Sequence, residues 1–102
     1  MKSLEEVRRQ LSSGNFEFSR HAFRRSVERN ISEQEIRESG IAADIIEDYP
    51  DDKYSPSVLL LGLSADGRPL HFQVALDNAP LAKIITIYEP NPGEWVDYRK
   101  RR

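Results

Sequence analysis

The stretch SVLLLGLSADGRPLHFQVAL, residues 57–76, decides the fold. Its first seven residues form a nearly continuous apolar run, which is typical of a buried strand. Asp66 and Gly67 then predict a tight turn between two antiparallel strands. After the turn, apolar and polar residues alternate, with Leu70, Phe72, Val74 and Leu76 on one face and His71, Gln73 and Ala75 on the other. The stretch therefore predicts a β-hairpin that carries His71 on the exposed, polar face of a sheet.

Three helices are predicted before this hairpin, each with a side chain that caps its first turn. The cap and stop residues are Ser3 with Glu6 and Gly14 for the first helix, Ser19 for the second, and Ser32 with Glu35 and Gly40 for the third. On the second helix, which runs to about residue 29, the spacing of Phe23 and Val27 indicates the buried side.

The remaining segments complete an antiparallel meander of about four strands over residues 44–97. In KIITIY, residues 83–88, Ile85 and Ile87 are expected to face the helices, and Ile84, Thr86 and Tyr88 the other side. Helices over about residues 3–42 followed by such a meander predict one α+β domain, residues 1–102, with the helices on one face of the sheet and a basic tail over residues 98–102.

The composition narrows the class of protein. Hydrophobic residues make up 38% of the chain and charged residues 31%, which is typical of a soluble globular domain. The absence of cysteine excludes disulfides and thiolate metal sites and is compatible with a cytoplasmic location. The amphipathic start carries Glu5 and Glu6 and does not resemble a signal peptide, and no apolar run is long enough to span a membrane. With two histidines and no HExxH motif, no metal or other cofactor is expected.

Basic residues gather in two places although the formal net charge is −2. Arg20, Arg24, Arg25 and Arg29 lie on the predicted second helix, and the chain ends in YRKRR. This pattern fits an anionic partner that contacts part of the surface, and it also fits an ordinary mixed surface. The tail is either a phosphate-attracting arm or a plain solvated terminus.

Two groups of polar residues could carry chemistry. His21 and Arg25 are i,i+4 neighbours that can converge on one anion, although a solvated face with an Arg25–Glu28 pair is equally simple. His71, Gln73, Thr86 and Tyr88 are predicted to share the outer face of the sheet.

Such groups suit the cleavage of RNA by its own 2′-hydroxyl, which needs a base, an acid and a cation near the phosphate. His71 could move the proton, Arg25 could hold the phosphate, and Tyr88 could donate a proton or stack on a base. Tyr49, Tyr54 and Trp95 are further candidates for stacking on single-stranded RNA.

Three stretches resemble the bacterial domain-of-unknown-function 4258 family: FSRHAFRRSVERNIS, IIEDYPDDKYSPSVLLLGLSADGRPLHFQVAL and IITIYEPNPGEW, which together cover about residues 18–95. The motif positions that this resemblance assigns are His21, Arg25, Arg29, Tyr49, His71, Thr86 and Tyr88. The chain departs from the family pattern at Phe72 and Gln73, where β-branched residues are expected. Gln73 could therefore make an additional polar contact. The resemblance implies a RelE-like toxin fold and an endonuclease that acts on messenger RNA, free or on the ribosome. It also implies an antitoxin partner of the CxxC zinc or helix-turn-helix type.

The sequence therefore predicts a metal-independent, toxin-like endoribonuclease that acts on single-stranded RNA. The expected catalytic residues are His71, His21, Arg25 and Tyr88, and the expected substrate-binding residues are Arg29, Tyr49, Gln73, Thr86 and Arg99. The alternative is a non-catalytic protein- or RNA-binding module of the same fold, in which His21 and His71 are structural. A nuclease that cuts DNA is a third reading.

Overall fold

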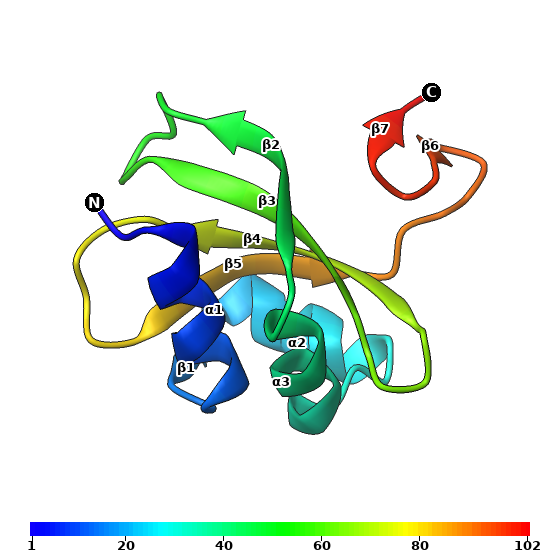
Figure 1. The fold of residues 1–102 in the computed structure, drawn as a ribbon, viewed down its shortest axis with the longest axis horizontal. Helices are drawn as coiled ribbons and strands as arrows, with labels where there is room; N and C mark the ends of the chain where they lie inside the picture. The colour runs from blue at the N-terminus through cyan, green and yellow to red at the C-terminus, as the bar shows by residue number, and fades with distance from the viewer.

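The computed structural model describes residues 1–102 as three helices and seven strands (Figure 1). The helices are α1 (Leu4–Ser12), α2 (Arg20–Glu28) and α3 (Glu33–Gly40). The strands are β1 (Phe16–Phe18), β2 (Asp44–Tyr49), β3 (Ser57–Leu63), β4 (Pro69–Ala75), β5 (Ala82–Tyr88), β6 (Trp95–Val96) and β7 (Lys100–Arg101). The longest helices have nine residues, and none has the length and apolar character that crossing a membrane requires.

The cap residues predicted from the sequence begin all three helices. The side chains of Ser3, Ser19 and Ser32 each accept a hydrogen bond from a backbone N–H in the first turn. At α3 the capping box is complete, because the Glu35 side chain also accepts from the Ser32 backbone. Local sequence therefore determines where each helix begins.

The main sheet has five strands in the order β1-β5-β4-β3-β2. Strands β2 to β5 pair antiparallel, but β1 adds to β5 in the parallel direction, with Phe16 opposite Ala82. The prediction of a four-stranded, wholly antiparallel sheet is thus corrected to a five-stranded mixed sheet. Three residues between two helices carry too little pattern to be recognised as a strand, and β1 forms because β5 offers it an unpaired edge.

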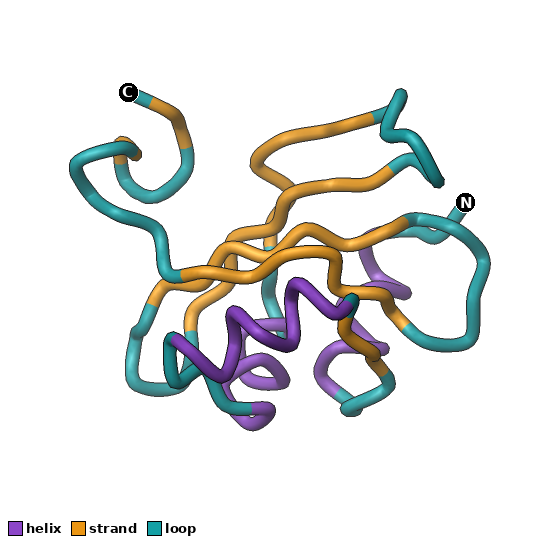
Figure 2. The backbone as a smooth tube through the Cα atoms, turned by 180° about the vertical axis from the view of Figure 1, so that it is seen from behind, coloured by secondary structure: helices purple, strands orange, loops and turns teal.

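The three helices cover one face of the sheet, as predicted, and the small hairpin of β6 and β7 lies on the opposite side (Figures 1 and 2). The core fills the space between sheet and helices. Its fully buried members include Leu60, Leu70 and Phe72 from β3 and β4, and Leu11 and Ile36 from the helices. The outer face of the sheet is thereby left for polar residues and for the hairpin.

A β-bulge in β5 corrects the prediction that Ile85 faces the helices and Ile84 does not. Gln73 pairs with Thr86 and Val74 with Ile84, so Ile85 is an extra residue on β5. Ile84 is consequently part of the core, whereas Ile85 is only partly buried. The other predictions for β5 are confirmed. Ile87 lies in the core, and Tyr88 and Thr86 pair with His71 and Gln73 of β4, respectively.

Helix α2 is rotated relative to the prediction. Phe23 and Val27 were expected on its buried side but are 58% and 62% exposed, and Ala22 and Ser26 face the sheet instead. Ser19 fixes this rotation, because its backbone N–H bonds to the Ile84 carbonyl and its hydroxyl to the Ile85 carbonyl. The small side chains of Ala22 and Ser26 let the helix lie close to β5.

Candidate functional site

A surface hollow of about 420 Å³ lies where α2 passes the end of β5. Strand β1 pairs with β5 only as far as Ile84, so the following residues of β5 have no strand on this side. The hollow is lined by His21, Arg25, Arg29, Thr86, Tyr88, Glu89, Asn91, Glu94 and Trp95. It brings together six residues nominated from the sequence, namely His21, Arg25, Arg29, Thr86, Tyr88 and Trp95.

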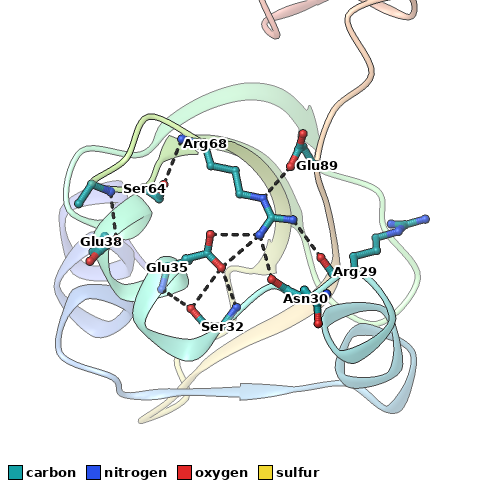
Figure 3. Close-up of polar contacts among 9 residues, drawn as sticks. Arg29, Asn30, Ser32, Glu35, Glu38, Ser64, Arg68 and Glu89 are labelled. Carbon is teal, nitrogen blue, oxygen red and sulfur yellow. Dashed lines mark hydrogen bonds and ion pairs between the residues drawn. The ribbon is translucent and has the colours of Figure 1, made fainter.

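A cluster around Arg68 holds the end of α2 beside this hollow (Figure 3). The Arg68 guanidinium donates to the backbone carbonyls of Arg29 and Asn30, both at 2.9 Å. It also pairs with Glu35 of α3 at 3.1 Å and with Glu89, just after β5, at 2.6 Å. One side chain from the β3–β4 turn thus joins two helices to the strand that carries Tyr88.

The two arginines of the hollow differ in how firmly they are held. Arg25 pairs with Glu28 at 3.2 Å, with both side chains well exposed, and such a pair contributes little to stability. Arg29 donates to the Ile87 carbonyl at 3.3 Å. Glu89 and Glu94 also line the hollow. Arg68 pairs with Glu89, and the guanidiniums of Arg25 and Arg29 can still bind an anion there.

His71 is fully buried, which corrects the prediction that it lies on an exposed face. The hairpin formed by β6 and β7 covers it: the imidazole ring meets the Trp95 ring edge-to-face at 4.4 Å, and its Nε2 lies 2.6 Å from the Tyr98 carbonyl oxygen. A strand pattern cannot reveal this cover, because it comes from residues far along the chain.

The hydrogen bonds of His71 define its tautomer. A carbonyl only accepts, so Nε2 carries a proton and donates it to Tyr98. In the neutral ring Nδ1 is then an acceptor, and the Tyr88 hydroxyl, 3.1 Å away, donates to it. His71 does not line the hollow, but it orients Tyr88, which does.

Burial affects both members of this pair. It lowers the pKa of His71, against the opposing effects of the Tyr98 carbonyl and the nearby Glu47 carboxylate. Burial likewise raises the pKa of Tyr88. The pair therefore consists of a neutral imidazole and a protonated phenol near neutral pH.

Tyr49, Arg99 and Gln73 were nominated with the others but lie elsewhere. Tyr49 bonds to Glu47, which also accepts two hydrogen bonds from Arg101, and burial, followed by this bond, raises the pKa of Tyr49 to about 12. Arg99 pairs with Asp44 at 3.1 Å on another part of the surface.

The predicted basic tail is not a loose arm, because Trp95 pairs with Arg101 and Val96 with Lys100.

The sequence interpretation missed Glu47, Asn91 and Glu94, the Tyr98 carbonyl, and the guanidinium of Arg101 over the Trp95 ring at 4.7 Å. Only Glu47 left a signal, since it lies two residues from Tyr49 in β2 and shares its face. The Tyr98 carbonyl and Arg101 depend on the turn at Asp97 and Tyr98, whose positive φ angles of 52° and 60° return the chain over the sheet. Asn91 and Glu94 lie in the segment between β5 and β6, which has no periodic pattern.

No group of three histidine, aspartate or glutamate side chains is arranged so that it could hold a metal ion. No curated protein and no solved structure matches the chain. The resemblance carried by the three motif stretches is nevertheless confirmed: the chain belongs to the family described as Domain of unknown function (DUF4258), whose sequence model matches residues 18–89.

Proposed function

We propose that this protein is a metal-independent endoribonuclease of the toxin type, with a fold related to the RelE-like toxins, acting on single-stranded RNA in the cytoplasm. The observation that carries the proposal is the hollow beside α2. It combines an exposed imidazole, two guanidiniums and a tyrosine whose hydroxyl is bonded to a buried histidine. These are the groups that cleavage by the 2′-hydroxyl of RNA requires.

In this mechanism Arg25 and Arg29 hold the phosphate and stabilise its developing charge. The 2′-oxygen attacks phosphorus, and its proton passes to the Tyr88 oxygen while Tyr88 gives its own proton to Nδ1 of His71. The bond from phosphorus to the 5′-oxygen breaks, and protonated His21 supplies a proton to that leaving oxygen. The products are a 2′,3′-cyclic phosphate and a 5′-hydroxyl.

His71 acts through Tyr88 in this scheme and touches no substrate. When it accepts the proton it becomes an imidazolium, and the Tyr98 carbonyl and the Glu47 carboxylate both favour that charged form. Burial keeps His71 neutral until that moment, so that Nδ1 is free to receive a proton.

Cleavage of a labelled RNA oligonucleotide in the presence of a chelator tests the proposal. His21→Gln and Arg25→Met should each lower the rate by about a hundredfold or more, which is typical for loss of an acid or of charge stabilisation. Arg24→Met is the matched control, because Arg24 lies on the same helix but does not line the hollow. Intact RNA, or equal cutting of the matching DNA, would contradict the proposal, because a DNA strand has no 2′-hydroxyl.

The burial of His71 favours one alternative, a non-catalytic RNA-binding module in which this residue is structural. The same oligonucleotide distinguishes the two functions. Binding that depends on Arg25 and Arg29, without any cyclic-phosphate product, would support the module. Growth arrest on induced expression of the wild type, with intact growth for His21→Gln, which changes only an exposed side chain, would support the enzyme.

We also propose that a neutralising antitoxin of the CxxC zinc or helix-turn-helix type covers α2 with an acidic, amphipathic segment. Arg20, Phe23, Arg24 and Val27 form one exposed stripe at i, i+3, i+4 and i+7, which is the pattern of a helix face that packs against another element. A second copy of this chain would bring arginines against arginines across a two-fold axis, whereas an acidic partner complements them.

Co-expression with the product of the adjacent gene tests this partner. It should relieve growth arrest by the wild type, and Val27→Asp should abolish the relief while leaving the arrest itself intact. Ile41→Asp, at an equally exposed apolar position away from α2, is the control and should be relieved like the wild type. If Val27→Asp leaves the relief of growth arrest unchanged, the partner does not bind to this face of α2, and the proposal is contradicted.

A further inference from the structure

A second hollow, of about 530 Å³, adjoins the first along β5. Ile85 lines the second hollow and Thr86 the first, and consecutive Cα atoms are only about 3.8 Å apart. The bulge at Ile85 makes this adjacency possible, because it adds an outward-facing residue beside Thr86. Ser19 and His21, two residues apart, border the second and first hollows respectively. A strand of RNA held at the first hollow would therefore pass directly over the second.

One wall of the second hollow is a fixed polar edge. The amide nitrogen of Gln73 donates to Asp52 at 3.1 Å and to Ser57 at 2.9 Å, and Ser57 donates to Asp52 at 2.7 Å. Because an ionised carboxylate only accepts, these bonds settle which end of the Gln73 amide is nitrogen. The Gln73 carbonyl oxygen has no hydrogen-bond partner within the protein. Asp52 Oδ1 accepts one hydrogen bond, from the Lys53 backbone N–H at 2.8 Å, so this oxygen and the Gln73 carbonyl oxygen are the acceptors that the edge still offers.

The remaining walls combine apolar surface and an exposed aromatic ring with polar side chains, among them Asp77. Ile85 and Ala75 contribute apolar surface, and Tyr54 stands beside them with 92% of its surface exposed. An aromatic ring left in water at the rim of a hollow is available to stack on a base. Lys53, whose ammonium lies 5.7 Å from the Tyr54 ring, and Lys83 bring positive charge to the same rim.

We propose that the second hollow is a base subsite that accepts guanine from the nucleotide next to the phosphate bound in the first hollow. Guanine offers two adjacent donors, N1–H and the N2 amino group, to the acceptor edge formed by Gln73 and Asp52. Adenine carries an acceptor at N1, so at this position two acceptors would face each other and no hydrogen bond could form. This inference rests on the proposed RNA substrate and extends it to a preferred base.

Titration with nucleoside monophosphates, observed through the backbone amide resonances of Ala75 and Ile85, which line the second hollow, tests the subsite. GMP should bind about tenfold more tightly than IMP, which lacks the N2 amino group, and more tightly than AMP or UMP, as expected for one well-placed polar pair. Equal affinity for the four nucleotides would overturn the proposal.

Two variants probe the two walls separately. Gln73→Met should remove the preference for GMP. Tyr54→Ala should lower the affinity for all four nucleotides by about tenfold, because stacking on the ring is lost. Tyr54 is too exposed for its truncation to affect folding, so this variant remains decisive if Gln73→Met is unstable. Ile41→Ala, at an exposed position that lines neither hollow, is the control and should bind like the wild type.

The same variants separate this inference from the proposed function. A preference for GMP without cleavage of RNA would support the base subsite and contradict the endoribonuclease proposal. Cleavage that depends on Arg25, but not on guanine or on Tyr54, would support the endoribonuclease and contradict the base subsite.

Discussion

The buried imidazole of His71 makes stability depend on pH near neutrality. In the unfolded chain it titrates near its ordinary pKa of 6.5, whereas burial lowers the pKa in the folded protein. Between these two values the unfolded chain binds a proton that the folded protein does not, so the free energy of unfolding falls as the pH is lowered. Urea denaturation at about pH 7.5 and about pH 5.5 should show this decline. The decline should be smaller in His71→Gln, and an identical decline in that variant would contradict the assignment.

Gly62 is required because β3 passes directly against the backbone of α3. A Cβ atom at this position would lie 2.2 Å from the Ser39 carbonyl oxygen, which cannot move without displacing the helix. Gly62→Ala should therefore cost about 3 kcal/mol or more, measured as a shift of the urea midpoint. Gly93→Ala is the control, because its nearest neighbour is the flexible side chain of Asn91 at 3.2 Å. Similar stability of the two variants would contradict this reading.

Single residues were predictable where a local period was enough. The i,i+4 spacing brought His21 and Arg25 to one hollow, and strand alternation placed Tyr88 opposite His71. The burial of His71 could not be predicted, because the atoms that cover it belong to Trp95 and Tyr98. Local patterns show which face a side chain takes but not which distant segment lies over that face.

Among the secondary-structure elements, α2 and β5 show where sequence patterns fail. The apolar spacing of Phe23 and Val27 is real, but the Ser19 cap binds β5 and turns the smaller side of the helix inward. In β5, a run of apolar and β-branched residues has no marker for the extra residue at Ile85. Both departures shape the candidate site: one presents His21 and Arg25 to the hollow, and the other joins the two hollows.

Arg68 should contribute more to stability than the other ion-pairing arginines, because it joins α2, α3 and β5. Arg68→Met should lower the free energy of unfolding by about 2 kcal/mol, since hydrogen bonds to two backbone carbonyls are lost together with the pairs to Glu35 and Glu89. Arg99→Met removes an exposed pair with Asp44 and should cost about 0.5 kcal/mol or less. Equal losses in urea denaturation would show that the Arg68 cluster is an ordinary surface network.

The pKa of Glu35 adds a second test of the Arg68 cluster. The backbone hydrogen bond from Ser32 and, after it, the bond from Arg68 lower the pKa of Glu35 below its ordinary value of 4.5. Its stabilising contribution is thus complete above that ordinary value and is lost as the pH falls through the lowered one. Thermal unfolding below about pH 4.5 should accordingly show a smaller acid-induced loss for Glu35→Gln than for the wild type.

At the scale of the whole molecule, the sequence predicted helices followed by strands, with the helices on one face of the sheet. It did not predict β1, because an edge strand of three residues is defined by its partner more than by its own pattern. Nor did it predict the hairpin of β6 and β7, since a short, mostly charged segment after Pro90 and Pro92 resembles a loop. Both missing parts lie at the periphery, where tertiary contacts and not intrinsic preferences decide the conformation.

The hairpin of β6 and β7 should detach before the rest of the protein unfolds. It is joined to the sheet mainly through the Tyr98 carbonyl, Trp95, and the exposed pairs of Arg99 and Arg101, and weakly joined segments open at lower free energy than the core. Trp95 is the only tryptophan, so its fluorescence reports on the hairpin alone, whereas circular dichroism reports on the helices. In urea the Trp95 emission should therefore shift at a lower concentration than the loss of helical signal. Glu47→Gln, which removes the charge opposite Arg101, should move the first transition lower and leave the second nearly unchanged. Coincident transitions in both proteins would instead mean that the hairpin, His71 and the sheet unfold as one cooperative unit.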